Sequence, residues 1–206
     1  MKSLTAAKSL NIALCRGNKA ILQQKLELLT NLNQAFGDSV SANTAFSSTC
    51  PIVGASIGQH YRHILDHVEQ PVKALLCGKE SNEKMLLHNL HYDVRNRGGS
   101  SETDVNETQA RIQYLMDVFA EEEDRLQDDT QEPLTGGSTT VHFMLSDDGK
   151  EFPLVSSLSR ELQFVLHHAI HHLAMVKIIA VHHIGLQSEL IPRDFGKAPS
   201  TLNYEK

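Results

Sequence analysis

Four separate stretches of the chain carry apolar residues at the spacing of one face of an α-helix. Each stretch has room for roughly four helical turns or more. A helix with a single apolar face must bury that face against another element, and four such helices favour a bundle around one core. The sequence therefore predicts an all-α, four-helix-bundle fold, with helices over residues 19–35, 54–76, 103–127 and 158–184.

Glycine, proline and polar clusters separate these helices from the rest of the chain. Residues 1–17 read as a helical lead-in that Gly17 ends, and the Ser-, Thr- and Asn-rich residues 37–52 read as a loop. Pro71 predicts a kink or a break in the second helix. Residues 77–101 are expected to be irregular or weakly helical.

One small β element is expected between the third and fourth helices. Val141, Phe143 and Leu145 alternate with polar residues, which is the period of a half-buried strand. An Asp-Asp-Gly turn follows, and apolar residues then resume. The pattern predicts a β-hairpin over residues 139–155.

Length and composition favour a single domain. A chain of 206 residues, 40% of them hydrophobic, can bury one sizeable core. We expect one domain over residues 1–206, with its core over about residues 18–186. Prolines and glycines predict an extended tail over residues 187–206.

Charge and apolar content argue against two classes of partner. The formal net charge is −6 and the basic residues are scattered, whereas proteins that bind nucleic acid through its phosphates carry a basic stripe. No apolar run reaches the roughly 18 residues of a membrane span, since histidines and Lys177 interrupt residues 162–184. No signal peptide is recognisable, and the three cysteines are widely spaced. These features predict a cytoplasmic protein with reduced thiols and without nucleic-acid or membrane partners.

The histidines are the unusual part of the composition, because there are twelve of them and no tryptophan. On the fourth helix, His168 and His172 lie near the apolar face, whereas His167 and His171 point away from it. An i, i+4 pair stands one turn apart and can chelate a single ion. Such a pair could instead be held by hydrogen bonds, but several unpaired imidazoles in a core are costly to desolvate. The pair therefore favours a metal site.

The second helix offers three more histidines. His60, His63 and His67 share one face because they are three, four and seven positions apart. The helical wheel places His60 and His67 nearer the apolar stripe and His63 further round. By this geometry any of the three could supply a third ligand. His142 stands apart from the other histidines in the sequence.

Two short segments resemble a known family. Residues 56–66, SIGQHYRHILD, resemble the second helix of the DinB/YfiT-like family, where a ligand histidine precedes an aliphatic residue and then an acid. Residues 168–172, HAIHH, resemble the family's fourth helix, where the first and last histidines bind metal. The resemblance implies a DinB-like bundle with the metal ligands His63, His168 and His172. The alternative ligands are His60, His67 and His171.

A site of this kind suits catalysis. Three neutral imidazoles leave coordination positions open, and they fit a divalent zinc, nickel or iron ion. Asp66 and Glu161 are candidates to accept hydrogen bonds from the ligand rings, although solvated carboxylates are the simpler interpretation. Tyr92, Arg95 and Arg97 form a polar patch that could bind an anionic group of a substrate, the alternative being a salt-bridged surface loop.

The resemblance implies a metal-dependent hydrolase or thiol S-transferase that acts on an unknown small molecule, with a low-molecular-weight thiol as a partner. Two other hypotheses remain open. One is a metal-binding, stress-associated protein without chemistry of its own, and the other is a dimeric interaction module with structural histidines. A homodimer is expected by analogy with the family. The long 77–101 segment, the hairpin and the tail depart from the family pattern and indicate a divergent branch.

Overall fold

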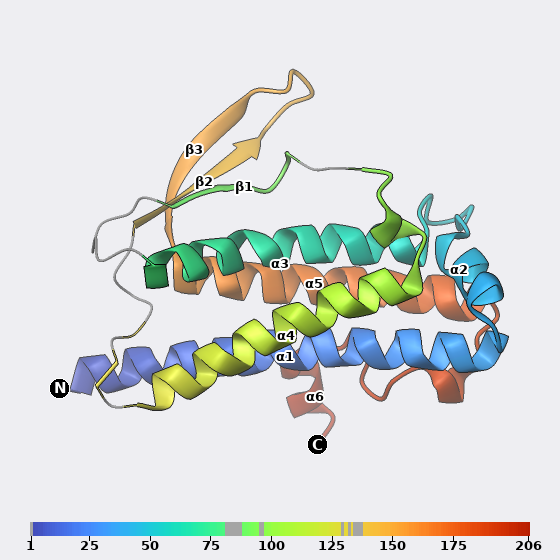
Figure 1. Cartoon of the computed structure of the whole chain (residues 1–206), viewed down its shortest axis with the longest axis horizontal. Helices are drawn as coiled ribbons and strands as arrows, with labels where there is room; N and C mark the ends of the chain where they lie inside the picture. Colours follow the sequence, from blue (N-terminus) through green and yellow to red (C-terminus); the bar gives the residue numbers. More distant parts are fainter. Residues whose placement is uncertain (1, 81–87, 95–96, 129, 132, 134–137) are drawn as a thin grey trace.

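The computed structural model describes residues 2–80, 88–94, 97–128, 130–131, 133 and 138–206. Among these residues the fold is mostly helical, with six α-helices and a small three-stranded sheet (Figure 1). The prediction of a helical protein is confirmed, and the β-structure is larger than the single hairpin that was expected.

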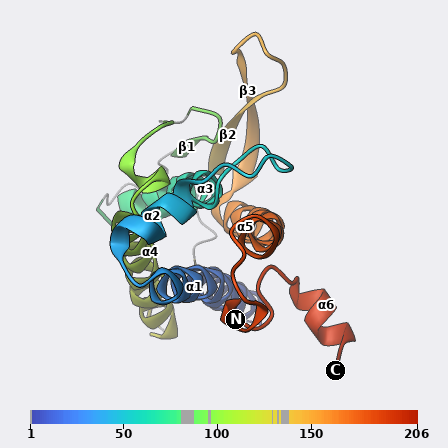
Figure 2. The same cartoon turned by 90° about the vertical axis from the view of Figure 1, so that its right-hand side faces the viewer.

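Four long helices enclose the apolar core. They are α1 (Lys2–Phe36), α3 (Ile57–Glu80), α4 (Val105–Gln127) and α5 (Leu158–His182). α1 packs against α4 and α5, and α3 packs against α5 and α4; Figure 2 shows the four nearly end-on. Each helix turns its apolar stripe inward, so the side chains between them lose almost all contact with solvent. Fully buried examples are Leu29, Leu65, Phe119 and Val165.

α1 runs without interruption through Gly17, so the predicted break there, with a new helix from about residue 19, was wrong. A Cβ at this position would lie 2.9 Å from a methyl carbon of Leu166 on α5. The glycine thus leaves room for the end of the flexible Leu166 side chain. Leu14, Cys15 and Phe195 are buried as well, so the core extends beyond the predicted residues 18–186.

A short helix, α2 (Ser39–Ser47), lies where a loop was predicted over residues 37–52. Asp38 caps it, because its side chain accepts a hydrogen bond from the backbone N–H of Ser41. Phe46 is fully buried. Tertiary packing stabilises this helix, since nine residues of polar composition would hardly form one alone.

The region around α3 also differs from the prediction. The helix continues through Pro71 to Glu80, so it neither breaks at the proline nor ends near residue 76. Strand β1 (His88–His91) follows within the stretch that was expected to be irregular or weakly helical. A 3-10 turn, η1 (Ser100–Glu102), then leads into α4.

The sheet has the order β1-β2-β3 and lies over the α3 and α5 side of the helices, away from α1 (Figures 1 and 2). β2 (Ser138–Met144) and β3 (Glu151–Ser157) form the predicted hairpin, with Phe143 opposite Phe152. β1 pairs with β2 in parallel, which places His91 beside His142. β3 leads directly into α5, so the sheet is connected to the helix that carries His168 and His172.

The tail is not wholly extended as predicted. It contains the 3-10 turn η3 (Ser188–Leu190) and the six-residue helix α6 (Pro199–Tyr204). Proline at the first position of α6 is compatible with a helix start because its missing N–H needs no partner there. The fully buried Phe195 anchors the tail between these two elements.

α5 is long and apolar enough to cross a membrane by length and composition alone. A core helix passes the same test, and α5 buries Leu162, Val165, Leu173 and Val176 against its neighbours. We therefore assign no membrane span on this ground.

A lysine lies inside the core. Lys25 of α1 is fully buried, and its Nζ has no hydrogen-bond partner among the described residues. This nitrogen lies 5.4 Å from the centroid of the Tyr61 ring. Burial, with a smaller effect of Arg111, lowers the pKa of Lys25 well below its ordinary value of 10.5. The folded state therefore favours the uncharged amine.

We expect Lys25→Met to raise the free energy of unfolding by about 2 kcal/mol at neutral pH, because it replaces an unsatisfied polar group with an apolar one of similar shape. In the wild type, the unfolded chain binds more protons than the folded one between the lowered pKa and about pH 10.4, so stability should rise with pH across that window. The variant should lose this rise. Urea denaturation between pH 7 and 10 measures both effects, and the exposed Lys177→Met is the control. A less stable Lys25→Met variant would contradict the interpretation.

Candidate metal centre

α3 and α5 bring together the three histidines expected as ligands. His63 comes from α3, and His168 and His172 come from α5. One ring nitrogen of each lies within 4.8 Å of the corresponding nitrogens of the other two. All three side chains are partly buried, so the group stands at the edge of the core and not inside it.

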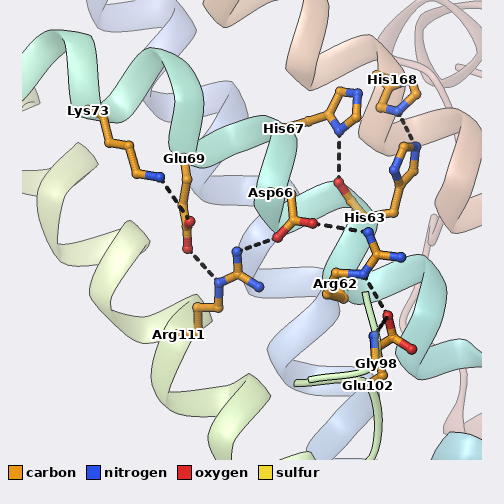
Figure 3. Close-up of polar contacts among 10 residues, drawn as sticks. All are labelled: Arg62, His63, Asp66, His67, Glu69, Lys73, Gly98, Glu102, Arg111 and His168. Carbon is orange, nitrogen blue, oxygen red and sulfur yellow. Dashed lines mark hydrogen bonds and ion pairs between the residues drawn. The ribbon is translucent and has the colours of Figure 1, made fainter. Parts of the chain in front are cut away.

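His63 is the centre of the group. Its Nε2 lies 2.9 Å from Nε2 of His168 (Figure 3), and its ring centroid lies 4.5 Å from that of His172. Between two neutral rings, one nitrogen donates a proton and the other accepts it. A cation that bound both nitrogens would replace this hydrogen bond, with the protons then carried on Nδ1.

His172 is held by a second histidine contact. Its Nδ1 lies 2.9 Å from Nδ1 of His60, which is buried. Burial and the nearby imidazoles of His168 and His60 lower the pKa of His172 to about 3. Burial, and then His171, also lowers the pKa of His60. Both rings are therefore neutral at physiological pH, which is the state in which imidazole binds metal.

His60 supports the His172 ring from α3. Its Nε2 is buried and has no hydrogen-bond partner among the described residues. Because His60 contacts His172 through Nδ1, it is placed to orient the His172 ring. His60, one of the alternative ligands, thus contacts a predicted ligand by a ring-to-ring hydrogen bond.

His67 forms one wall of the centre. Its Nδ1 donates to the backbone oxygen of His63 over 2.9 Å (Figure 3). Its ring stacks on His168 at 4.4 Å and on Tyr92 at 5.0 Å between centroids. Phe164, one turn before His168, stacks on that ring at 5.5 Å. Phe164 was not among the residues predicted for the site, although its i−4 spacing from His168 is visible in the sequence.

Asp66 and Glu161, the two carboxylates considered as acceptors for the ligand rings, lie in different surroundings. Glu161 is fully buried and accepts a hydrogen bond of 2.8 Å from the Tyr92 hydroxyl, so it supports the wall through Tyr92 and does not contact a ligand ring. Asp66 contacts Arg62 at 3.0 Å and Arg111 at 2.7 Å, away from the histidines (Figure 3). Neither carboxylate takes the candidate role of accepting a hydrogen bond from a ligand ring. The simpler interpretation, a solvated carboxylate, was wrong for the fully buried Glu161, and Asp66 is paired with two arginines.

Of the two substrate-binding candidates that the structure describes, Tyr92 lies at the centre and Arg97 does not. Tyr92 is buried against His67. Arg97 is exposed, and Arg95 lies outside the described residues. His171 is exposed next to His172, with ring centroids 5.2 Å apart. It therefore faces solvent, as the helical periodicity predicted.

Comparisons with known proteins add little to this geometry. No family model matches the chain. No solved structure matches it either. A curated protein, FK506-binding protein 5 of Rhizopus delemar, is 35% identical over 117 residues, which are 57% of this chain and 28% of that protein. The chain thus spans little more than a quarter of that relative's length, and the match does not bear on the histidine centre.

Proposed function

We propose that the chain is a divergent DinB-like four-helix bundle that binds one divalent metal ion through His63, His168 and His172. The observation that carries the proposal is the convergence of three ring nitrogens from two helices within 4.8 Å of one another. Four long helices around one core are compatible with this family's architecture.

The donor set fits a zinc-like ion. Zinc binds imidazole nitrogen at about 2.0–2.1 Å, which puts tetrahedral ligands about 3.3 Å apart. The His63 and His168 nitrogens are already 2.9 Å apart, so small side-chain rotations would bring the three rings into range. Nickel and iron take the same ligands, and the chemistry of the site admits all three.

We infer that the centre serves a transferase or hydrolase reaction on a small molecule, with a low-molecular-weight thiol as the co-substrate of the transferase. A divalent ion held by three neutral imidazoles would supply Lewis acidity that promotes proton loss from a thiol or water molecule. Aromatic residues of this chain would form one side of the site. His67 and Phe164 stack on the His168 ring, and Tyr92 stacks on His67 and packs edge-on against Phe164, so these rings would limit access of water on that side.

Metal content and turnover test the proposal in turn. Purified wild-type protein, analysed by inductively coupled plasma mass spectrometry, should carry about one zinc, nickel or iron ion per chain more than His168→Ala, and the exposed His167→Ala should match the wild type. Loaded protein should then consume a small thiol in the presence of an electrophile, or hydrolyse an ester or amide. Metal without turnover would overturn the enzymatic part in favour of a metal-binding protein. Equal metal content in the wild type and His168→Ala would overturn the whole proposal and favour structural histidines.

A further inference from the structure

A second group of ligand-type side chains lies on the sheet. His91, His142 and Glu151 come one each from β1, β2 and β3. His91 is the register partner of His142, and Glu151 is the partner of Met144, two residues along β2 from His142. Since side chains two apart on a strand share a face, all three project from the same side of the sheet.

The three side chains already contact one another. His91 Nδ1 lies 2.7 Å from Oε2 of Glu151, and the rings of His91 and His142 stack at 4.3 Å with 12° between their planes. Each residue offers a ligand atom within 4.8 Å of the other two. Asn89 contacts Nε2 of His142 over 3.1 Å and fixes the orientation of that ring.

Glu151 has more coordinating capacity than its contacts use. Its Oε1 is buried and has no hydrogen-bond partner among the described residues. A buried carboxylate oxygen without a partner is destabilising. The His91 side chain is 41% exposed, so an ion can reach the cluster from solvent. Two imidazoles and a carboxylate form a donor set that zinc accepts.

We propose that His91, His142 and Glu151 form a second divalent-cation site, which takes zinc and joins the three strands. The site is independent of the His63 centre, because it shares no ligand with it. The cation would link β1 to the hairpin, and β1 is followed directly by Tyr92, the residue that stacks on His67. The second ion would therefore hold the aromatic wall of the first centre in place.

Zinc titration of the full chain tests this site with the first one removed. In a His168→Ala/His172→Ala background, isothermal titration calorimetry should still detect one zinc ion per chain. Adding His91→Ala or His142→Ala should abolish that binding. Adding His88→Ala should leave it unchanged, since His88 lies on the same strand but its side chain points to the other face.

Glu151→Gln gives an independent check. Its amide oxygen can still accept the hydrogen bond from His91, so the strands stay paired, but the negative charge is lost. We expect zinc affinity to fall at least about tenfold and the zinc-dependent rise in melting temperature to shrink accordingly. No zinc binding in the background variant, or equal binding in its His91→Ala and His88→Ala derivatives, would show that the cluster is only a hydrogen-bonded strand contact.

Discussion

Replacing His172 with alanine should lower the affinity for zinc at the α3–α5 centre by about a hundredfold or more. Loss of a residue that merely orients a ligand costs about 10–100-fold in metal affinity, so loss of a ligand should cost at least as much as the upper end of that range. The same change at His171 should have little effect, because that neighbouring side chain is exposed. The two variants differ by one position on one helix, which makes them a matched pair.

The measurement is zinc competition with a chromophoric chelator in a His91→Ala background, which removes the site on the sheet. His60→Ala should fall between the two variants, at about a tenfold loss, since it removes only the contact that orients His172. Thermal melting in the presence of a chelator checks that each variant folds. Equal affinities for His172→Ala and His171→Ala would exclude His172 as a ligand.

A methyl group at position 58 should destabilise the fold by about 3 kcal/mol or more. A Cβ on Gly58 would lie 2.0 Å from the backbone oxygen of Glu102 and 2.9 Å from the Phe46 ring. Backbone cannot rotate out of the way as a side chain can, so the change must separate α3 from η1. That separation would also break the contact of 2.8 Å between Arg62 and Glu102. Urea denaturation of Gly58→Ala gives the loss directly.

Gly17→Ala is the control for that experiment. Its nearest neighbours would be side-chain atoms of Leu166, and the closest of them is a methyl carbon at the end of that flexible side chain. Alanine is favoured over glycine in a helix interior by about 1 kcal/mol, so this variant should be as stable as the wild type or slightly more stable. If both glycine variants lost stability equally, the contact between α3 and η1 would not be the cause.

The long helices could be predicted because an apolar stripe reports burial directly. The same reasoning placed His168 and His172 near the apolar face of α5, and the structure has both partly buried at the edge of the core. Prediction from the pattern failed at residue types that are common both in loops and in packed helices. Gly17 resembles a helix terminator but provides room for Leu166, and the polar residues of α2 resemble a loop but bury Phe46.

Other parts of the site depend on contacts between distant segments. The helical wheel placed His63 further from the apolar stripe than His60 and His67. Only the packing of α3 on α5 brings it to the middle of the histidine group. Asp66 contacts arginines from two helices, which no local pattern reveals. His142 stood apart in the sequence because its partner His91 is brought to it by a parallel strand pairing.

That parallel pairing also bears on how the protein matures. It joins two strands that are separated along the chain by the whole of α4. Closing so long a loop is entropically unfavourable, and such pairings tend to form after local helices during folding. The contact between His63 and His168 spans 105 positions, which is a longer loop than the one that the β1–β2 pairing closes, so it too should form late. We therefore expect a newly synthesised chain to form its long helices before either the sheet or the histidine centre is assembled.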